Sequence, residues 1–258
     1  MSAEILAGLV AGIGGGGLRV VDLTQTLDPD FPTIVLPPEL GQCAPFRMEE
    51  VSRYDARGPA WYWNNFSCGE HTGTHLDAPA HWVTGRDRPN GTVDALDPAS
   101  FVAPACVVDC EAEAASDPDY CLDREKLDAF EAAHGRIPAG AWVLMRTGWS
   151  RRTGAAFANL AEDGAHTPGI EAEAIRWLVE ERGILGFGTE TIGTDAGQAH
   201  RFSPPYPAHG SLHGAGRLGL QCLAHLDRLP ATGAVILAAP LKIVRGSGSP
   251  LRVVALVP

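Results

Sequence analysis

Short apolar runs rich in β-branched residues recur along the chain, separated by longer polar or glycine-containing stretches. Such runs favour extended backbone, and a run that is apolar at nearly every position is typical of a strand buried on both faces. The pattern predicts strands over residues 18–24, 105–111, 142–148, 184–190, 234–240 and 252–258.

Two other segments, 124–135 and 170–183, repeat apolar residues at helical spacing, and each ends in a glycine that suits a helix stop. Before the second segment, Thr167 followed by Pro168 resembles a helix start. The apolar face of this second predicted helix consists of Ile170, Ala174, Trp177 and Leu178. We expect both helices to pack on a sheet.

The order of the predicted elements mixes strands and helices without strict alternation. This order favours an α/β fold with a mixed, irregular sheet and flanking helices over a doubly wound or barrel fold. Residues 14–17 are four consecutive glycines, so residues 1–17 are expected to form a helix and a loose turn. The chain has 258 residues, 45% of them hydrophobic, which suits one domain over residues 1–258 but would also allow two small ones.

The formal net charge of −11 argues against nucleic acid or an anionic membrane surface as a partner. The longest apolar stretches, residues 234–240 and 253–258, are much shorter than the ~20 residues of a membrane-spanning helix. Residues 1–13 include Glu4 and lack the basic and apolar regions of a secretory signal. We therefore expect a cytoplasmic protein without a membrane partner.

The six cysteines are scattered through a chain that is large enough to fold without disulfide bridges, so we expect free thiols. Cys106 and Cys110 have a spacing that a metal-binding pair could use, but their apolar surroundings favour a buried strand.

The most informative segment is WYWNNFSCGEHTGTHLDAPAHW, residues 61–82. Its four candidate metal ligands are His71, His75, Asp77 and His81. All four have odd numbers, so in an extended chain they would share one face. A straight strand would hold the first and the last about 33 Å apart, at about 3.3 Å per residue, so the chain must bend if they share one site. Gly73 and Pro79 are the residues able to bend it.

Imidazole and carboxylate groups suit a divalent ion that keeps positions open for water and substrate. One alternative is that the histidines are surface or core residues that lie close by chance, but the shared face and the two bend-forming residues argue against it. Another alternative is a closed structural metal site. Such sites usually use cysteine ligands and are not bordered by tryptophans.

The segment HTGTHLDAPAH, residues 71–81, resembles the signature of the cyclase superfamily, which includes kynurenine formamidases and isatin hydrolases. VVDLTQTL at 20–27, MRTGW at 145–149 and FGTETIGTDAG at 187–197 resemble other pieces of that family. The resemblance implies a swivelling β/β/α fold, a homodimer or higher oligomer, and hydrolysis of an amide or cyclic amide by metal-activated water.

In kynurenine formamidases, a late histidine and a glutamate that follows it serve a second zinc ion, and here His209 and Gln221 occupy that spacing. With Asp77 as the one certain anionic ligand, two dications would leave about +3 of uncompensated charge. We therefore expect one divalent ion. Its expected ligands are His71, His75 and Asp77, with Gln221 bound directly or through water. The amide and carboxylate oxygens favour Mn²⁺, and Zn²⁺ is the other possibility.

The missing glutamate and the aromatic flank of the motif make the chain more similar to isatin hydrolases than to the formamidases. Each flanking aromatic residue would singly suit a core, but together they are expected to form a flat apolar slot for a small aromatic amide. These residues are Trp61, Trp63, Phe66 and Trp82. His213 is expected either to line the same pocket or to lie at the surface.

The reaction that this resemblance implies is the opening of a cyclic aromatic amide, isatin to isatinate, by water activated on the ion. His81 is expected to act as general base and then to protonate the departing nitrogen, and His209 is the second candidate catalytic residue. In the alternative, a two-metal N-formylkynurenine formamidase, both histidines would bind the second ion. A metal-dependent lyase and a ligand-sequestering protein are rival interpretations of the same residues.

Overall fold

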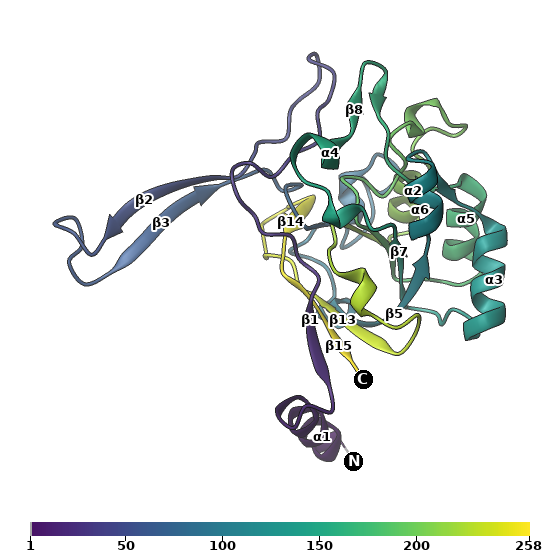
Figure 1. The fold of residues 1–258 in the computed structure, drawn as a ribbon, viewed down its shortest axis with the longest axis horizontal. Helices are drawn as coiled ribbons and strands as arrows, with labels where there is room; N and C mark the ends of the chain where they lie inside the picture. Colours follow the sequence, from purple (N-terminus) through teal and green to yellow (C-terminus); the bar gives the residue numbers. More distant parts are fainter. Residues whose placement is uncertain (1) are drawn as a thin grey trace.

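A large mixed sheet forms the centre of the computed structural model, which describes residues 2–258 (Figure 1). Within these residues the nine strands of the sheet lie in the order β1 (Arg19–Asp22), β15 (Val253–Val257), β13 (Ala234–Ala238), β5 (Val102–Asp109), β7 (Trp142–Arg146), β11 (Gly186–Thr189), β12 (Leu218–Gln221), β4 (His75–Asp77) and β14 (Gly248–Pro250). The four strands from β5 to β12 run parallel, and the strands on both sides of them pair antiparallel. The prediction of an α/β fold with a mixed, irregular sheet is confirmed.

Smaller elements complete the chain. Three two-stranded sheets pair β2 (Arg47–Arg53) with β3 (Tyr62–Ser67), β6 (Cys121–Leu122) with β10 (Gly169–Ile170), and β8 (Leu160–Ala161) with β9 (Gly164–Ala165). The α-helices are α1 (Ser2–Gly14), α2 (Glu111–Ser116), α3 (Arg124–His134), α4 (Gly154–Ala158), α5 (Ala172–Glu180) and α6 (Pro207–Gly214). Short 3-10 helices span η1 (Pro79–His81), η2 (Pro98–Phe101), η3 (Trp149–Arg151), η4 (Ala199–Arg201) and η5 (Leu226–Arg228).

Both faces of the central sheet are buried at its middle strands β7, β11 and β12, as the apolar runs predict, whereas β13 and β15 alternate between buried and half-buried residues. On β7, Trp142 and Leu144 belong to one apolar cluster, while Val143 and Met145 belong to the other. The second cluster also contains buried residues of α3, α5 and α6, so these helices cover that face. Because successive side chains of a strand point to opposite faces, a strand packed on both sides must be apolar at every position.

The helix that ends before Gly135 is confirmed as α3, and this glycine has φ +87° at the helix end. The predicted start of the second helix is wrong. Ile170 lies in β10, which pairs with β6, and α5 begins only at Ala172. The cause is a close approach of two backbones, because a Cβ atom at Gly169 would lie 2.1 Å from the Ala196 nitrogen. Contact with this loop holds the segment extended, which the Thr-Pro signal could not indicate.

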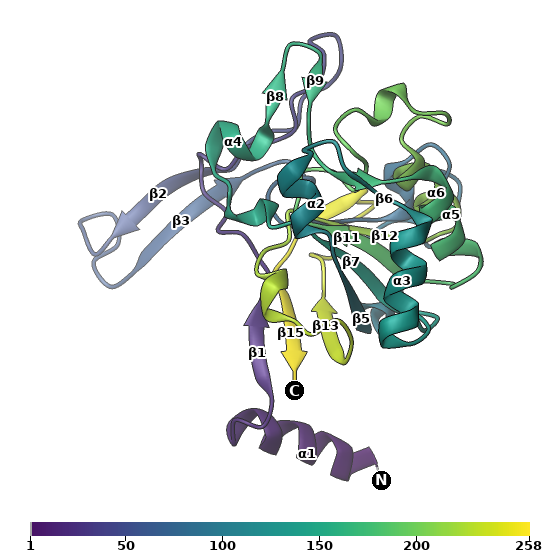
Figure 2. The same cartoon turned by 45° about the vertical axis from the view of Figure 1, so that its right-hand side comes forward.

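Two parts of the chain extend away from the sheet (Figures 1 and 2). One is α1, which ends at the predicted run of glycines, and the other is the hairpin of β2 and β3, which we call the arm. Both expose apolar side chains, among them Ile5 and Val10 on α1 and Trp61 and Trp63 on the arm. Exposed apolar side chains that gather on projecting elements suggest contact with another molecule.

All six cysteines are unbridged, which confirms the prediction of free thiols. Burial raises the pKa of Cys106 to about 11 and that of Cys110 to about 12, so both thiols stay protonated and unreactive near neutral pH. Over residues 2–258 the helices are too short or too polar to cross a lipid bilayer.

Candidate metal centre and active site

The signature segment turns where the sequence predicts. Gly73 has φ +67°, a conformation that glycine adopts without strain, and Pro79 begins η1. Between these bends, β4 carries His75 and Asp77, both buried. The bent chain brings all four candidate ligands to one region of the molecule, since the rings of His71 and His81 lie 4.0 Å apart between centroids.

Glycines on the two strands beside β4 make room for these side chains. Gly219 of β12 and Gly248 of β14 both pair with Asp77. A Cβ atom at Gly219 would lie 3.3 Å from Asp77 Oδ2, and one at Gly248 would lie 2.4 Å from His71 Cε1. Larger residues at these positions would therefore displace the carboxylate or the imidazole ring.

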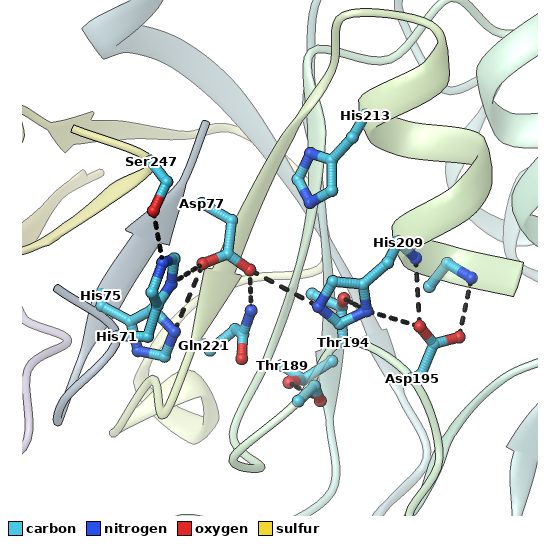
Figure 3. Close-up of polar contacts among 12 residues, drawn as sticks. His71, His75, Asp77, Thr189, Thr194, Asp195, His209, His213, Gln221 and Ser247 are labelled. Carbon is cyan, nitrogen blue, oxygen red and sulfur yellow. Dashed lines mark hydrogen bonds and ion pairs between the residues drawn. The ribbon is translucent and has the colours of Figure 1, made fainter. Parts of the chain in front are cut away.

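Two histidine nitrogens face the same oxygen of Asp77 (Figure 3). His71 Nδ1 lies 2.7 Å and His75 Nε2 lies 3.4 Å from Asp77 Oδ1. His75 donates its Nδ1 hydrogen to the Gly73 carbonyl at 2.8 Å, so in the neutral ring Nε2 carries the lone pair. Both nitrogens thus lie near the carboxylate oxygen that would face a divalent ion, and binding of the ion would replace the hydrogen bond between His71 and Asp77.

Asp77 is in the charged form that a metal ion requires. Burial opposes that form, but the hydrogen bond from His71 and the charge of His75 outweigh it and hold the pKa of Asp77 well below its usual range. Asp77 is fully buried, and both of its oxygen atoms have partners.

His81 lies at the end of η1, beside the first group of ligands. One nitrogen of His81, one of His71 and one oxygen of Asp77 all lie within 4.8 Å of one another. Burial, which outweighs the attraction of Asp77, lowers the pKa of His81 to about 3. Its imidazole is therefore neutral, the form that can accept a proton or bind a metal ion.

The other oxygen of Asp77 faces different residues. The Gln221 amide nitrogen donates to Asp77 Oδ2, and His209 Nε2 lies 3.7 Å from the same atom. Gln221 reaches this position because it pairs with His75 across β12 and β4. In this orientation Gln221 stabilises the carboxylate, and the role expected for it as a metal ligand stays a prediction.

Asp195 holds His209 in place. Its carboxylate accepts the Nδ1 hydrogen of His209 at 2.5 Å and the backbone hydrogens of Ala208 and His209 at 2.7 and 3.1 Å. The side chains of Asp195 and His209 are both buried. Burial works against a charged imidazole, but the hydrogen bond and charge of Asp195 prevail and raise the pKa of His209. His209 thus holds a proton more readily than His81 does.

His213 lies one helical turn after His209 on α6 and points to the same site (Figure 3). Its Nδ1 hydrogen bonds to the Arg217 carbonyl at 3.2 Å, which leaves Nε2 with a lone pair. Nε2 is buried and has no hydrogen-bond partner among the described residues. Burial lowers the pKa of His213 to about 4. The surface position expected as one alternative for His213 is wrong, since the residue is fully buried, and its place in a substrate pocket stays a prediction.

The four predicted aromatic residues do not come together in one chain. Trp82 lies at the site, with its ring 4.8 Å from that of His209 and 5.5 Å from that of Tyr206. Trp61, Trp63 and Phe66 belong to the arm or its border, and 50%, 55% and 64% of their surfaces are exposed. A slot formed by all four within one chain is therefore wrong, because the arm extends away from the sheet.

Sequence reasoning missed several residues around the site. Asp195 and Glu190 both lie in the recognised segment 187–197, but their type alone did not reveal their partners. Glu190 is buried and accepts hydrogen bonds from Thr147 and Gly148 backbone nitrogens and from the Ser150 hydroxyl. It therefore joins the ends of β7 and β11, and only the structure shows this, because the sequence does not reveal which acidic residues are buried.

Comparison with known proteins assigns the chain to a family. The family model described as "Putative cyclase" matches residues 21–196. A curated isatin hydrolase of Roseibium aggregatum is 49% identical over 262 residues, covering 100% of this chain and 99% of the relative. A curated kynurenine formamidase of Salinibacter ruber is 31% identical over 190 residues, covering 71% of this chain and 74% of the relative.

Two solved structures superpose on nearly the whole chain. Isatin hydrolase A from Labrenzia aggregata, bound to benzyl benzoate, is 63% identical, covers 98% of each chain and gives a TM-score of 0.97. An isatin hydrolase bound to the product analogue thioisatinate is 48% identical, covers 100% of this chain and 99% of its own, and gives a TM-score of 0.98. These superpositions confirm the cyclase-type fold that the sequence resemblance implies.

Proposed function

Since this chain belongs to the cyclase family, we propose that it is a metal-dependent hydrolase that opens the cyclic amide of isatin to give isatinate. The observation that carries the proposal is the match to an isatin hydrolase over essentially the full length of both chains. The geometry supports the same chemistry, because nitrogens of His71 and His75 lie 2.7 and 3.4 Å from Asp77 Oδ1, and imidazole and carboxylate groups are the usual ligands of hydrolytic metal ions.

We propose one divalent ion on the Oδ1 side of Asp77, with Mn²⁺ favoured and Zn²⁺ possible. A bound ion would activate a water molecule and polarise the amide carbonyl. A second group, Asp77 with His209 and His213, also brings its ligand atoms within 4.8 Å of one another. Both groups depend on the same carboxylate, and one carboxylate offsets the charge of two dications poorly.

In this proposal His81 and His209 divide the proton transfers. Neutral His81 takes a proton from the attacking water as the C–O bond forms. The C–N bond of the lactam then breaks, and the departing nitrogen takes a proton from His209 Nε2, while Asp195 keeps the Nδ1 hydrogen of His209 in place. The opposite shifts of the two histidine pKa values suit one base and one acid.

Trp82 would cover one face of the aromatic substrate. The unpartnered Nε2 of His213 would accept a hydrogen bond from the substrate. Trp61, Trp63 and Phe66 can take part only if the arm reaches the site of another subunit. The chain is therefore proposed to form a homodimer or a higher homo-oligomer, in which the arm contacts a second copy. A cytoplasmic location is proposed as well, because six unbridged cysteines suit a reducing compartment.

The substrate is tested by following the absorbance of isatin and of N-formylkynurenine with protein that has been stripped of metal and reloaded with Mn²⁺ or Zn²⁺. We expect metal-dependent loss of isatin and much slower loss of N-formylkynurenine. The reverse preference, together with two bound ions per chain, would support the kynurenine formamidase alternative.

The oligomer is tested by light scattering during size-exclusion chromatography. We expect the wild type to be a dimer or larger, and Trp61→Ser with Trp63→Ser to shift it toward the monomer. An exposed apolar exchange away from the arm, Val244→Ser, is the matched control. A monomeric wild type would contradict this part of the proposal.

A further inference from the structure

Three aromatic rings lead from the buried site to the surface of the molecule. The ring of Trp82 lies 4.8 Å from that of His209 and 5.5 Å from that of Tyr206, measured between ring centroids. His209 is buried, Trp82 is half-buried, and 39% of the surface of Tyr206 is exposed. Tyr206 is therefore the ring at the open end of this series.

The backbone of Tyr206 has a conformation that suits glycine better than tyrosine. Its φ of 51° and ψ of 57° lie in the left-handed region, where the Cβ atom of an L-residue crowds the backbone. Tyr206 also precedes Pro207, and a residue before proline prefers an extended conformation. A tyrosine at this position therefore costs free energy that a glycine would reduce.

Hydrogen bonds on both sides keep Tyr206 in this conformation. Its backbone nitrogen donates to the Ala199 carbonyl at 3.1 Å, and its own carbonyl accepts from the Gly210 nitrogen at 3.0 Å. The tyrosine ring then meets Trp82 edge-on, with an angle of 65° between the ring planes. Strained backbone conformations cluster at functional sites, where the position of a side chain is part of the function. The position of this ring beside Trp82 is thus the feature that the strain maintains.

We infer that Tyr206 is a specificity-determining residue, whose ring extends the aromatic wall that begins at Trp82 and contacts the fused ring of a bicyclic aromatic amide. This inference rests on the proposed function. The reacting carbonyl would lie beside Asp77 and its neighbours, so the fused ring of the substrate would point outward past Trp82. Tyr206 supplies a second aromatic ring from the same chain, in a place where the three aromatic residues of the arm are missing.

The test compares three variants of Tyr206 in metal-loaded protein, with isatin as the substrate. Tyr206→Phe keeps the ring and should stay within about twofold of the wild-type KM, whereas Tyr206→Leu and Tyr206→Gly should raise KM by roughly 5–10-fold, the usual contribution of an aromatic contact. The value of kcat should change little. A ring that touches the substrate away from the reacting carbonyl binds the ground state and the transition state equally.

Thermal unfolding and metal content separate this role from a structural one. Tyr206→Gly relieves the left-handed conformation, so its Tm should stay near that of the wild type although the ring is lost. Its metal content should be unchanged. The matched control is Asn90→Gly, at another exposed residue with a left-handed φ of 54°, and this exchange should leave KM unaltered.

Binding of isatinate to the metal-loaded protein, measured by calorimetry, gives a readout that does not depend on turnover. Its Kd should rise in Tyr206→Leu and Tyr206→Gly by the same factor as KM. A lower Tm and a lower kcat in Tyr206→Gly, with the isatinate Kd unchanged, would mean that the ring has only a structural role and would overturn the inference.

A wild-type KM in Tyr206→Leu would also overturn the inference, because bulk alone would then suffice, and it would leave the proposed function standing. A wild type that does not hydrolyse isatin would instead contradict the proposed substrate, and the isatinate Kd values would then decide the role of Tyr206. Failure of isatinate to bind the wild type would overturn both.

Discussion

The two oxygen atoms of Asp77 face regions of the molecule that are built differently. Oδ1 faces His71 and His75, which come from the signature segment itself. Oδ2 faces Gln221 of β12 and His209 of α6, which the central sheet brings in from the C-terminal half. On the first side two imidazole rings of the signature segment converge on one anionic oxygen, whereas on the second side the Gln221 amide donates a hydrogen bond to the other and His209 lies 3.7 Å from it.

This difference suggests a division of labour. The Oδ1 side offers the ring nitrogens of the signature segment, which can bind a cation once they have released their hydrogens, and the Oδ2 side offers His209, which can serve proton transfer. Asp195 reinforces the contrast, because its charge keeps a hydrogen on His209 Nδ1 and raises the pKa of the ring against the effect of burial. Variants on the two sides should therefore fail in different ways.

The largest effect is expected from His75→Ala on the Oδ1 side. Removal of this ring should abolish metal retention, and turnover should fall to background because the remaining groups cannot hold an activating ion. Metal analysis of the purified variant, together with an isatin assay, measures both losses. The control is His200→Ala, an exposed histidine of η4. Full metal content in His75→Ala would remove the basis for distinguishing the two sides.

His81→Ala tests whether His81, which lies beside the ligands of the Oδ1 side, acts as a base or as a metal ligand. We expect the variant to keep its metal and to lose roughly 10²–10⁴-fold in kcat, because a positioned acid–base group contributes about that much. Metal content and kcat are measured on the same preparation. Loss of metal in parallel with activity would place His81 among the ligands and favour the two-metal alternative.

Asp195→Asn acts on the Oδ2 side and should alter the pH dependence of kcat rather than the metal content. The carboxylate raises the pKa of His209, so its loss should lower that pKa. Protonated His209 is required as the acid, so kcat should fall with rising pH from a lower pH than in the wild type.

At the optimum, Asp195→Asn should reduce kcat by roughly 10–100-fold. The measurement is kcat from pH 5 to 10 with isatin, and the control is Asp87→Asn, an exposed residue. A high-pH limb that does not move would mean that His209 is not the acid.

The smallest effect is expected from Gln221→Glu, which would make the Oδ2 side resemble a metal site. A second carboxylate should strengthen binding of a second ion by roughly tenfold, equivalent to ~1.4 kcal/mol. Titration of metal-free protein with Zn²⁺ measures the stoichiometry and both affinities. Two tightly bound ions in the wild type would contradict the single-ion proposal before the variant is needed.

The strands of the central sheet were predictable because burial on both faces leaves a signal in the sequence itself. β7 is apolar from Trp142 to Met145, and these residues contribute to both clusters. The start of α5 was not predictable, since a contact between Gly169 and the loop at Ala196 keeps Ile170 in a strand. Local signals describe the preference of a segment, and a tertiary contact can override that preference.

The sequence by itself determined the ligand segment, including the bends at Gly73 and Pro79, because the conformation of a few neighbouring residues depends mainly on their own backbone limits. Only the tertiary structure decided which atoms face Asp77 from outside that segment and that the aromatic arm leaves the site. His209, Gln221 and Ser247 reach Asp77 or its ligands through strand pairing and helix packing over long stretches of chain. Such contacts depend on how distant strands and helices pack together, and no short pattern in the sequence encodes that packing.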